Sequence, residues 1–107
     1  MKINYLMLLL VIIISQKSFS QINNFEIQKS IYEKSKSYND PNVAISALYN
    51  MIAIQPDNIL LKDSLMREYY AISQWAPAYM ISREILLDDT ENLIALEISC
   101  ITLQNLG

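Results

Sequence analysis

The stretch that decides the fold is residues 41–58, which reads PNVAISALYNMIAIQPDN. Residues 75–92, which begin 34 positions later, read WAPAYMISREILLDDTEN. In this alignment Ala44 corresponds to Ala78, and both stretches end in asparagine. A fixed period of this length is typical of proteins built from stacked repeats, each a small supersecondary unit. Such stacks present surfaces to other molecules, so the sequence favours a binding scaffold.

Apolar residues recur along the chain at spacings of three and four, the pattern of amphipathic helices rather than of strands. We predict five helices, at residues 22–38, 41–54, 58–72, 76–87 and 91–106. In the first helix the apolar stripe is Ile27, Ile31 and Tyr38. Because every loop is short, helices that are neighbours in sequence are expected to pack antiparallel.

Capping residues indicate where several of these helices begin. Asp40 precedes Pro41, which reads as an N-cap followed by a proline in the first turn, where a missing N–H costs nothing. Asp57 or Asn58 is expected to cap the third helix. The acids of residues 88–91 are expected to cap the fifth, where negative charge complements the helix dipole.

The first 20 residues have the layout of a secretory signal. Lys2 supplies a positive charge, residues 5–14 form an unbroken apolar run, and residues 18–20 place serines at the two positions that signal peptidase inspects. The apolar run is half of the about 20 residues that a membrane-spanning helix needs. We predict cleavage after Ser20, export to the periplasm or out of the cell, and no membrane insertion after cleavage. An uncleaved N-terminal anchor is the alternative.

Charge and composition exclude several classes of ligand. Cleavage removes two lysines and no acid, so the net charge falls from −3 to −5. Because Lys and Arg contacts to phosphate dominate nucleic-acid affinity, an acidic chain without a basic cluster is not expected to bind nucleic acid. With no histidine and one cysteine, no metal site is expected. Cys100 stands among Ile98, Ile101 and Leu103, which predicts a buried thiol.

Catalysis has little support in the sequence. Without histidine there is no ordinary catalytic triad, and a single glycine cannot form a glycine-rich phosphate loop. The acids at positions 88, 89 and 91 lack the alternating ligands and the glycine of a calcium loop. We therefore expect neither enzymatic activity nor a cofactor.

The chain resembles the tetratricopeptide repeat (TPR) family, whose unit is a 34-residue helix–turn–helix. Tyr69 stands at the family's tyrosine late in the first helix, and Ser73 at its turn glycine. Trp75 stands at the turn aromatic, and Ala78 at the alanine that lets paired helices approach closely. The preceding unit has the matching residues Ala44, Leu48 and Pro56-Asp57-Asn58.

The units depart from the family pattern at several positions. Tyr32, Met66 and Cys100 stand where a small residue is favoured, Ser82 replaces a large apolar residue, and Thr90 replaces the closing proline. Other helical-hairpin repeats of similar length remain the alternative.

The resemblance covers residues 22–107 and implies an all-α fold, with antiparallel helical hairpins stacked as a short right-handed superhelical solenoid. The domain would be residues 21–107 behind a signal peptide at 1–20, with repeats at about 25–58 and 59–92 and a partial repeat at 93–107.

The resemblance also implies where a partner binds, because in TPR proteins the first helix of each hairpin lines the concave ligand groove. The predicted partner-binding residues are Lys29, Glu33, Arg67, Tyr70, Ile94, Glu97 and Ile101. Arg67 and Tyr70 are the candidate anchors, since such side chains carry a large share of interface energy. The alternative is that Asp63 and Arg67, four residues apart, pair on a solvated surface. Tyr69 and Trp75 are expected in the core.

The last predicted helix is unusually apolar for the end of a repeat array. Its residues Ile94, Leu96, Ile98, Ile101, Leu103 and Leu106 cannot all face the preceding helices, and terminal repeats normally carry a polar outer face. The period also places Gly107 at the turn glycine of a third unit. We expect either a truncated chain or a helix that docks on a partner or on further repeats. A complete protein with an apolar last helix is the alternative.

Two functions fit these observations. The first is an exported scaffold that binds a protein or peptide segment in its groove, without chemistry. The second is the N-terminal extracytoplasmic repeat region of a longer membrane receptor, such as a sensor kinase.

Overall fold

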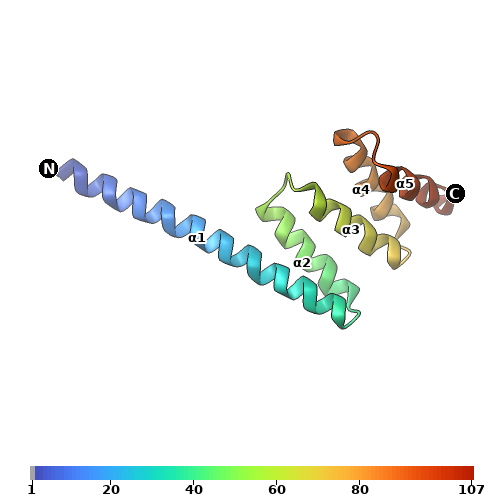
Figure 1. Ribbon diagram of the computed structural model, residues 1–107, viewed down its shortest axis with the longest axis horizontal. Coiled ribbons are helices and arrows are strands. Elements are labelled where there is room, and N and C mark those ends of the chain that lie inside the picture. Colours follow the sequence, from blue (N-terminus) through green and yellow to red (C-terminus); the bar gives the residue numbers. More distant parts are fainter. Residues whose placement is uncertain (1) are drawn as a thin grey trace.

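The computed structural model describes the backbone of residues 2–107 and the side chains of residues 4–12 and 24–107. Over these residues the fold is all-α, as the sequence predicts. The helices are α1 (Lys2–Ser37), α2 (Pro41–Ile54), α3 (Ile59–Ala71), α4 (Trp75–Asp88) and α5 (Leu93–Leu106). Each helix packs on the next along the chain, and α3 also packs on α5. Figure 1 shows the N-terminal half of α1 extending away from the other four helices.

Four of the five helices begin and end within two residues of the predicted positions, but α1 begins at Lys2 rather than at residue 22. The predicted start was wrong because residues 2–37 contain neither proline nor glycine, so nothing in the backbone stops the helix. The predicted cleavage position after Ser20 lies outside the residues whose side chains are described, and cleavage stays a prediction. Among the described residues, no helix is long and apolar enough to cross a membrane.

The turns that close each helical hairpin use the same backbone conformation. Asn39 and Ser73, which are 34 residues apart, have positive φ angles of 55° and 60°. In both turns the next residue's N–H reaches back five positions, from Asp40 to the Ser35 carbonyl and from Gln74 to the Tyr69 carbonyl, each at 2.9 Å. This is the Schellman arrangement that ends many helices. The predicted 34-residue period is therefore present in the backbone hydrogen bonds.

A second kind of turn joins α2 to α3 and α4 to α5, and it repeats with the same interval. The caps are Asn58 and Asn92, whose side-chain oxygens accept hydrogen bonds from the Leu60 and Ala95 N–H groups at 3.1 and 3.0 Å. The prediction that the acids of residues 88–91 cap the last helix was wrong, because Asn92 fills that place. The prediction for the second helix is confirmed, since Asp40 accepts from the Val43 N–H.

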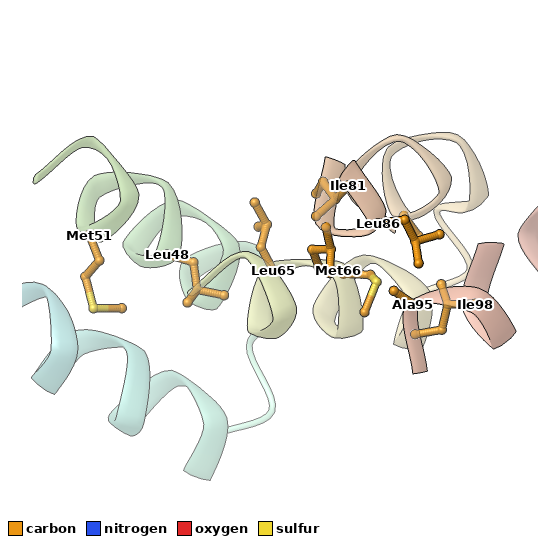
Figure 2. Packing of buried hydrophobic residues seen from close by; sticks show 10 residues of the cluster. Leu48, Met51, Leu65, Met66, Ile81, Leu86, Ala95 and Ile98 are labelled. Carbon is orange, nitrogen blue, oxygen red and sulfur yellow. The ribbon is translucent and has the colours of Figure 1, made fainter. Parts of the chain in front are cut away.

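The core is one apolar cluster that runs through α2, α3, α4 and α5. Figure 2 shows its side chains pointing into the space between these helices, with Met66 near the middle. Its fully enclosed members include Leu48, Met66, Ala78 and Ile85. Burial of apolar surface at about 25 cal/mol per Å² makes this cluster the main source of stability.

The first helix buries a different face from the predicted one. Ile27, Ile31 and Tyr38 are exposed, and Tyr38 keeps 81% of its surface in solvent. Phe25 and Tyr32 pack against the core cluster instead. The prediction chose the wrong side of this helix. Because α1 packs on α2 alone, only one narrow side of α1 is buried, and several of its apolar residues remain exposed.

Candidate functional site

The seven predicted partner-binding residues lie on three helices, α1, α3 and α5. Their exposed face is called the odd-helix surface below. Lys29, Glu33, Arg67, Ile94 and Glu97 are exposed. Tyr70 and Ile101 are half-buried.

In the part of the chain that the structure describes, two of the three possible pairs among these helices are in contact, one through packing and one through a single ion pair. Helices α3 and α5 pack directly. Helices α1 and α3 are joined by an ion pair between the Lys36 ammonium and the Glu68 carboxylate. Among the described residues, neither α1 and α3 nor α2 and α4 make a backbone contact with each other. The odd-helix surface of the described chain is therefore linked from α3 to α5 by packed helices and from α1 to α3 by this ion pair alone.

Arg67, one of the two candidate anchors, already has a partner within its own helix. Its Nε donates to Oδ2 of Asp63 at 2.8 Å, the pairing expected for residues four apart. The Arg67 side chain nevertheless keeps 49% of its surface exposed. Because exposed pairs of this kind are worth about 0.3–0.5 kcal/mol, the guanidinium can exchange Asp63 for another carboxylate at little cost.

Tyr70, the second candidate anchor, belongs partly to the core. Its ring meets that of Trp75 edge-to-face, with centroids 5.7 Å apart. Tyr70 and Tyr69 both pack against the core cluster, and Trp75 is half-buried. Tyr70 thus presents one edge to solvent while its ring supports the turn between α3 and α4.

Glu68 is a polar residue of this region that the sequence did not single out. It is 6% exposed, and its Oε1 accepts a hydrogen bond from Nζ of Lys36. The signal was present, because Glu68 continues the spacing of Leu61 and Leu65 along the buried side of α3. A carboxylate on a buried stripe predicts a cationic partner, but the sequence does not say which one.

The hydrogen bond that the Lys36 ammonium donates to Glu68 raises the pKa of Lys36 above its ordinary value of 10.5, although partial burial opposes the shift. A raised lysine pKa means that the folded chain holds the proton more tightly than the unfolded chain. The resulting stabilisation is complete below pH 10.5 and is lost as the pH rises through the folded-state value. At neutral pH the pair therefore ties the end of α1 to α3.

A pair of tyrosines also joins α2 to α3. The hydroxyl groups of Tyr49 and Tyr69 are 2.9 Å apart, and their rings meet edge-to-face at 6.4 Å. Burial raises the pKa of the Tyr69 phenol to about 12, with a smaller contribution from the hydrogen bond to Tyr49. The predicted placement of Tyr69 against the core is confirmed.

Replacing Tyr49 with phenylalanine is expected to lower the pKa of Tyr69 from about 12 while leaving it above 10.0, because burial is the larger cause. The raised value also means that the contribution of Tyr69 to stability is complete below pH 10.0 and is lost as the pH rises towards 12. Spectrophotometric titration of tyrosinate checks the first expectation. Tyr38→Phe, at an exposed tyrosine, is the control that leaves the Tyr69 step in place. Identical Tyr69 steps in Tyr49→Phe and the unmodified chain would contradict the pairing.

The outer side of α5 is largely apolar and open to solvent, as the sequence predicts. Only Ile98 of its six predicted apolar residues is buried, and Leu103 and Leu106 keep about half of their surface exposed. The prediction of a buried Cys100 was wrong, since this thiol is exposed. Met66, its counterpart 34 residues earlier, is enclosed because α4 and α5 lie against α3.

A cleft of about 250 Å³ opens beside the ion pair, between the end of α1, the start of α2 and the end of α3. Pro41, Ala44 and Ile72 form its apolar part, and Lys36 and Glu68 its charged edge. The described residues contain no group of three His, Cys, Asp or Glu side chains that could hold a metal ion.

Comparison with known proteins returns no match: no protein-family model matches the sequence, and neither a curated protein nor a solved structure does so.

Proposed function

We propose that this chain is an exported, non-catalytic scaffold of the TPR type that binds a segment of another protein on the odd-helix surface. The observation that carries the proposal is the arrangement of the helices. α3 packs on α5 and is tied to α1 by the Lys36–Glu68 ion pair, whereas α2 and α4 make no backbone contact within the described part of the chain.

This arrangement supports a curved stack. Between the second and third units α3 packs on α5, which supports convergence on the side of the odd-numbered helices, whereas between the first two units neither α1 and α3 nor α2 and α4 make a backbone contact in the described residues. The 34-residue repetition of the turns supports a constant rotation from one hairpin to the next. Repeats that rotate in this way form superhelices with a concave binding face. The proposed TPR-like solenoid places the odd-helix surface on that face.

The chemistry of the odd-helix surface favours a peptide partner. Lys29, Glu33 and Arg67 give one end alternating charge, while Ile94 and Ile101 make the other end more apolar. A peptide segment with charged residues followed by an apolar anchor residue matches this change from a charged end to an apolar end of the surface. Helical surfaces of this kind bind extended or helical segments by a few anchors rather than along their whole length.

Replacing Arg67 with alanine tests the proposal. Peptides would first be selected from a displayed random library on the full chain, and their affinities measured by fluorescence anisotropy. We expect Arg67→Ala to weaken binding at least about tenfold, because truncating a hot-spot arginine costs about 2 kcal/mol or more and tenfold corresponds to about 1.4 kcal/mol.

Arg83→Ala is the matched control. Arg83 is an exposed arginine of α4, outside the odd-helix surface, and its loss should leave the same affinities unchanged. The proposal would be contradicted if the selected peptides bound Arg67→Ala and the unmodified chain with equal affinity. It would also be contradicted if their affinity depended on Arg83 instead, since the binding surface would then lie elsewhere.

A further inference from the structure

The cleft between α1, α2 and α3 exists because the first repeat lacks an aromatic pair that the second repeat contains. Lys36 and Pro41 border the cleft. Tyr70 and Trp75 stand 34 residues after them, and their rings pack edge-to-face at 5.7 Å. The backbone is equivalent in both places, since the turn residues Asn39 and Ser73 share the same left-handed conformation. Space that holds two rings in one repeat is open in the other.

The apolar wall of the cleft is suited to an aromatic ring. Ala44 corresponds to Ala78, and both are buried small residues in the first turns of α2 and α4. Pro41 and Ile72 complete the wall in the first repeat. A cavity of about 250 Å³ is below the size of the pockets of 300–1,000 Å³ that hold drug-sized ligands, so it suits one side chain rather than a cofactor.

The charged edge of the cleft offers a hydrogen-bond acceptor. Glu68 is buried, with only 6% of its surface exposed. Of its two carboxylate oxygens, only Oε1 accepts a hydrogen bond, from Lys36. No fully buried side-chain oxygen or nitrogen of the described residues lacks a partner, so the second carboxylate oxygen is not fully enclosed, and Glu68 lines the cleft. In the second repeat the corresponding residue is Thr102, whose hydroxyl is bonded to the Ile98 carbonyl at 2.6 Å. The free acceptor belongs to the first repeat.

We infer that this cleft receives one aromatic side chain of the bound protein segment, a tryptophan or tyrosine that carries a hydrogen-bond donor. The ring lies against Pro41 and Ala44, and its N–H or O–H donates to Glu68. The Lys36 ammonium, at the charged edge of the cleft, adds a cation–π attraction to the face of the ring. The incoming ring takes the place that Tyr70 and Trp75 occupy in the second repeat. This inference rests on the proposed function for its partner, while the cleft itself is tested without one.

Three amino-acid amides test the cleft directly on the isotope-labelled full chain by two-dimensional NMR. N-acetyl-tryptophanamide and N-acetyl-tyrosinamide are expected to shift backbone amides near residues 35–44 and 68–72. N-acetyl-phenylalaninamide, which has a ring but no donor on it, is expected to bind about tenfold more weakly, as for the loss of one hydrogen bond to a charged group. Shifts confined to other helices, or equal affinity for all three, would overturn the inference.

A variant that copies the second repeat provides the decisive comparison. Lys36→Tyr combined with Pro41→Trp fills the cleft with the chain's own aromatic pair and is expected to abolish binding of the tryptophan and tyrosine probes. Ser30→Tyr adds a ring to an exposed turn of the same helix, outside the predicted partner-binding residues, and is the control that should bind normally. Glu68→Gln keeps the shape and is expected to weaken both probes about tenfold, so the result does not depend on folding of the double variant. Unchanged probe binding in the double variant and in Glu68→Gln would refute the site.

The peptides selected on the full chain separate this inference from the proposed function. If these peptides lose affinity for Arg67→Ala but not for the cleft-filling variant, the proposed binding on the odd-helix surface is supported and the aromatic site in the cleft is refuted. If the probes bind in the cleft while no peptide depends on Arg67, the aromatic site is supported and the proposed binding on the odd-helix surface is refuted.

Discussion

Replacing Met66 with alanine is expected to lower the free energy of unfolding by about 2–5 kcal/mol, the range for truncating a large buried apolar side chain. Met66 has no exposed surface and lies in the middle of the cluster that joins the two hairpins (Figure 2). Removing its side chain forfeits burial and leaves a cavity between α3, α4 and α5. Because small domains are stable by only about 5–15 kcal/mol, this single change removes a large share of the total.

Urea unfolding followed by circular dichroism measures the effect as a lower midpoint at a similar slope. Cys100→Ala is the matched control, because Cys100 occupies the same position 34 residues later but is exposed. Its replacement is expected to change stability by less than about 0.5 kcal/mol. Equal losses at the two positions would mean that the outer side of α5 is covered in solution and not open to solvent.

The difference between Met66 and Cys100 also shows what a repeated sequence predicts and what it does not. The period places both residues correctly on the same side of their helices. Burial depends on the neighbouring helices, and α3 lies between α2 and α4 while α5 packs on α4 and α3 only. A pattern that is local in sequence cannot report this, which is why the buried thiol was predicted wrongly.

The helices α2 to α5 could be predicted because local signals mark their ends. Pro41 and Asn58 act through their own backbone or side chain on the next few residues, so no tertiary information is needed. The cap of α5, Asn92, is equally local, although the prediction assigned that role to the acids before it. No capping residue or proline indicates the start of α1 before residue 22, so its first residue was predicted wrongly. Within α1 the buried side depends on its single neighbour, so Tyr32 and not Tyr38 meets the core.

The candidate site follows the same division between local and distant contacts. The pairing of Asp63 with Arg67 spans one helical turn and could be predicted from spacing alone. The contact between Lys36 and Glu68 spans 32 residues and depends on how α1 lies against α3. The cleft beside it depends on the same packing. The sequence does show that Lys36 and Pro41 replace an aromatic pair, but only the structure shows that the replacement leaves an open space.

Replacing Ala78 with leucine is expected to lower the free energy of unfolding by about 1–3 kcal/mol, because inserting methylene groups into a packed core forces side chains and backbone apart. Ala78 has no exposed surface and belongs to the core cluster at the start of α4. Ala76→Leu, two residues earlier on the exposed side of α4, is the control and is expected to stay within about 0.5 kcal/mol of the unmodified chain. Thermal or urea unfolding of the three proteins measures both effects.

The same substitution at the equivalent position of the first repeat is expected to cost less. Ala44 is also buried, but it borders the cleft, so a leucine there can extend into open space instead of displacing a neighbouring helix. Ala44→Leu should therefore destabilise the chain by less than Ala78→Leu, and it should also compete with the tryptophan probe for the cleft. Equal destabilisation at both alanines, with probe binding retained in Ala44→Leu, would mean that the two hairpins are packed alike and that the first repeat has no vacant aromatic position.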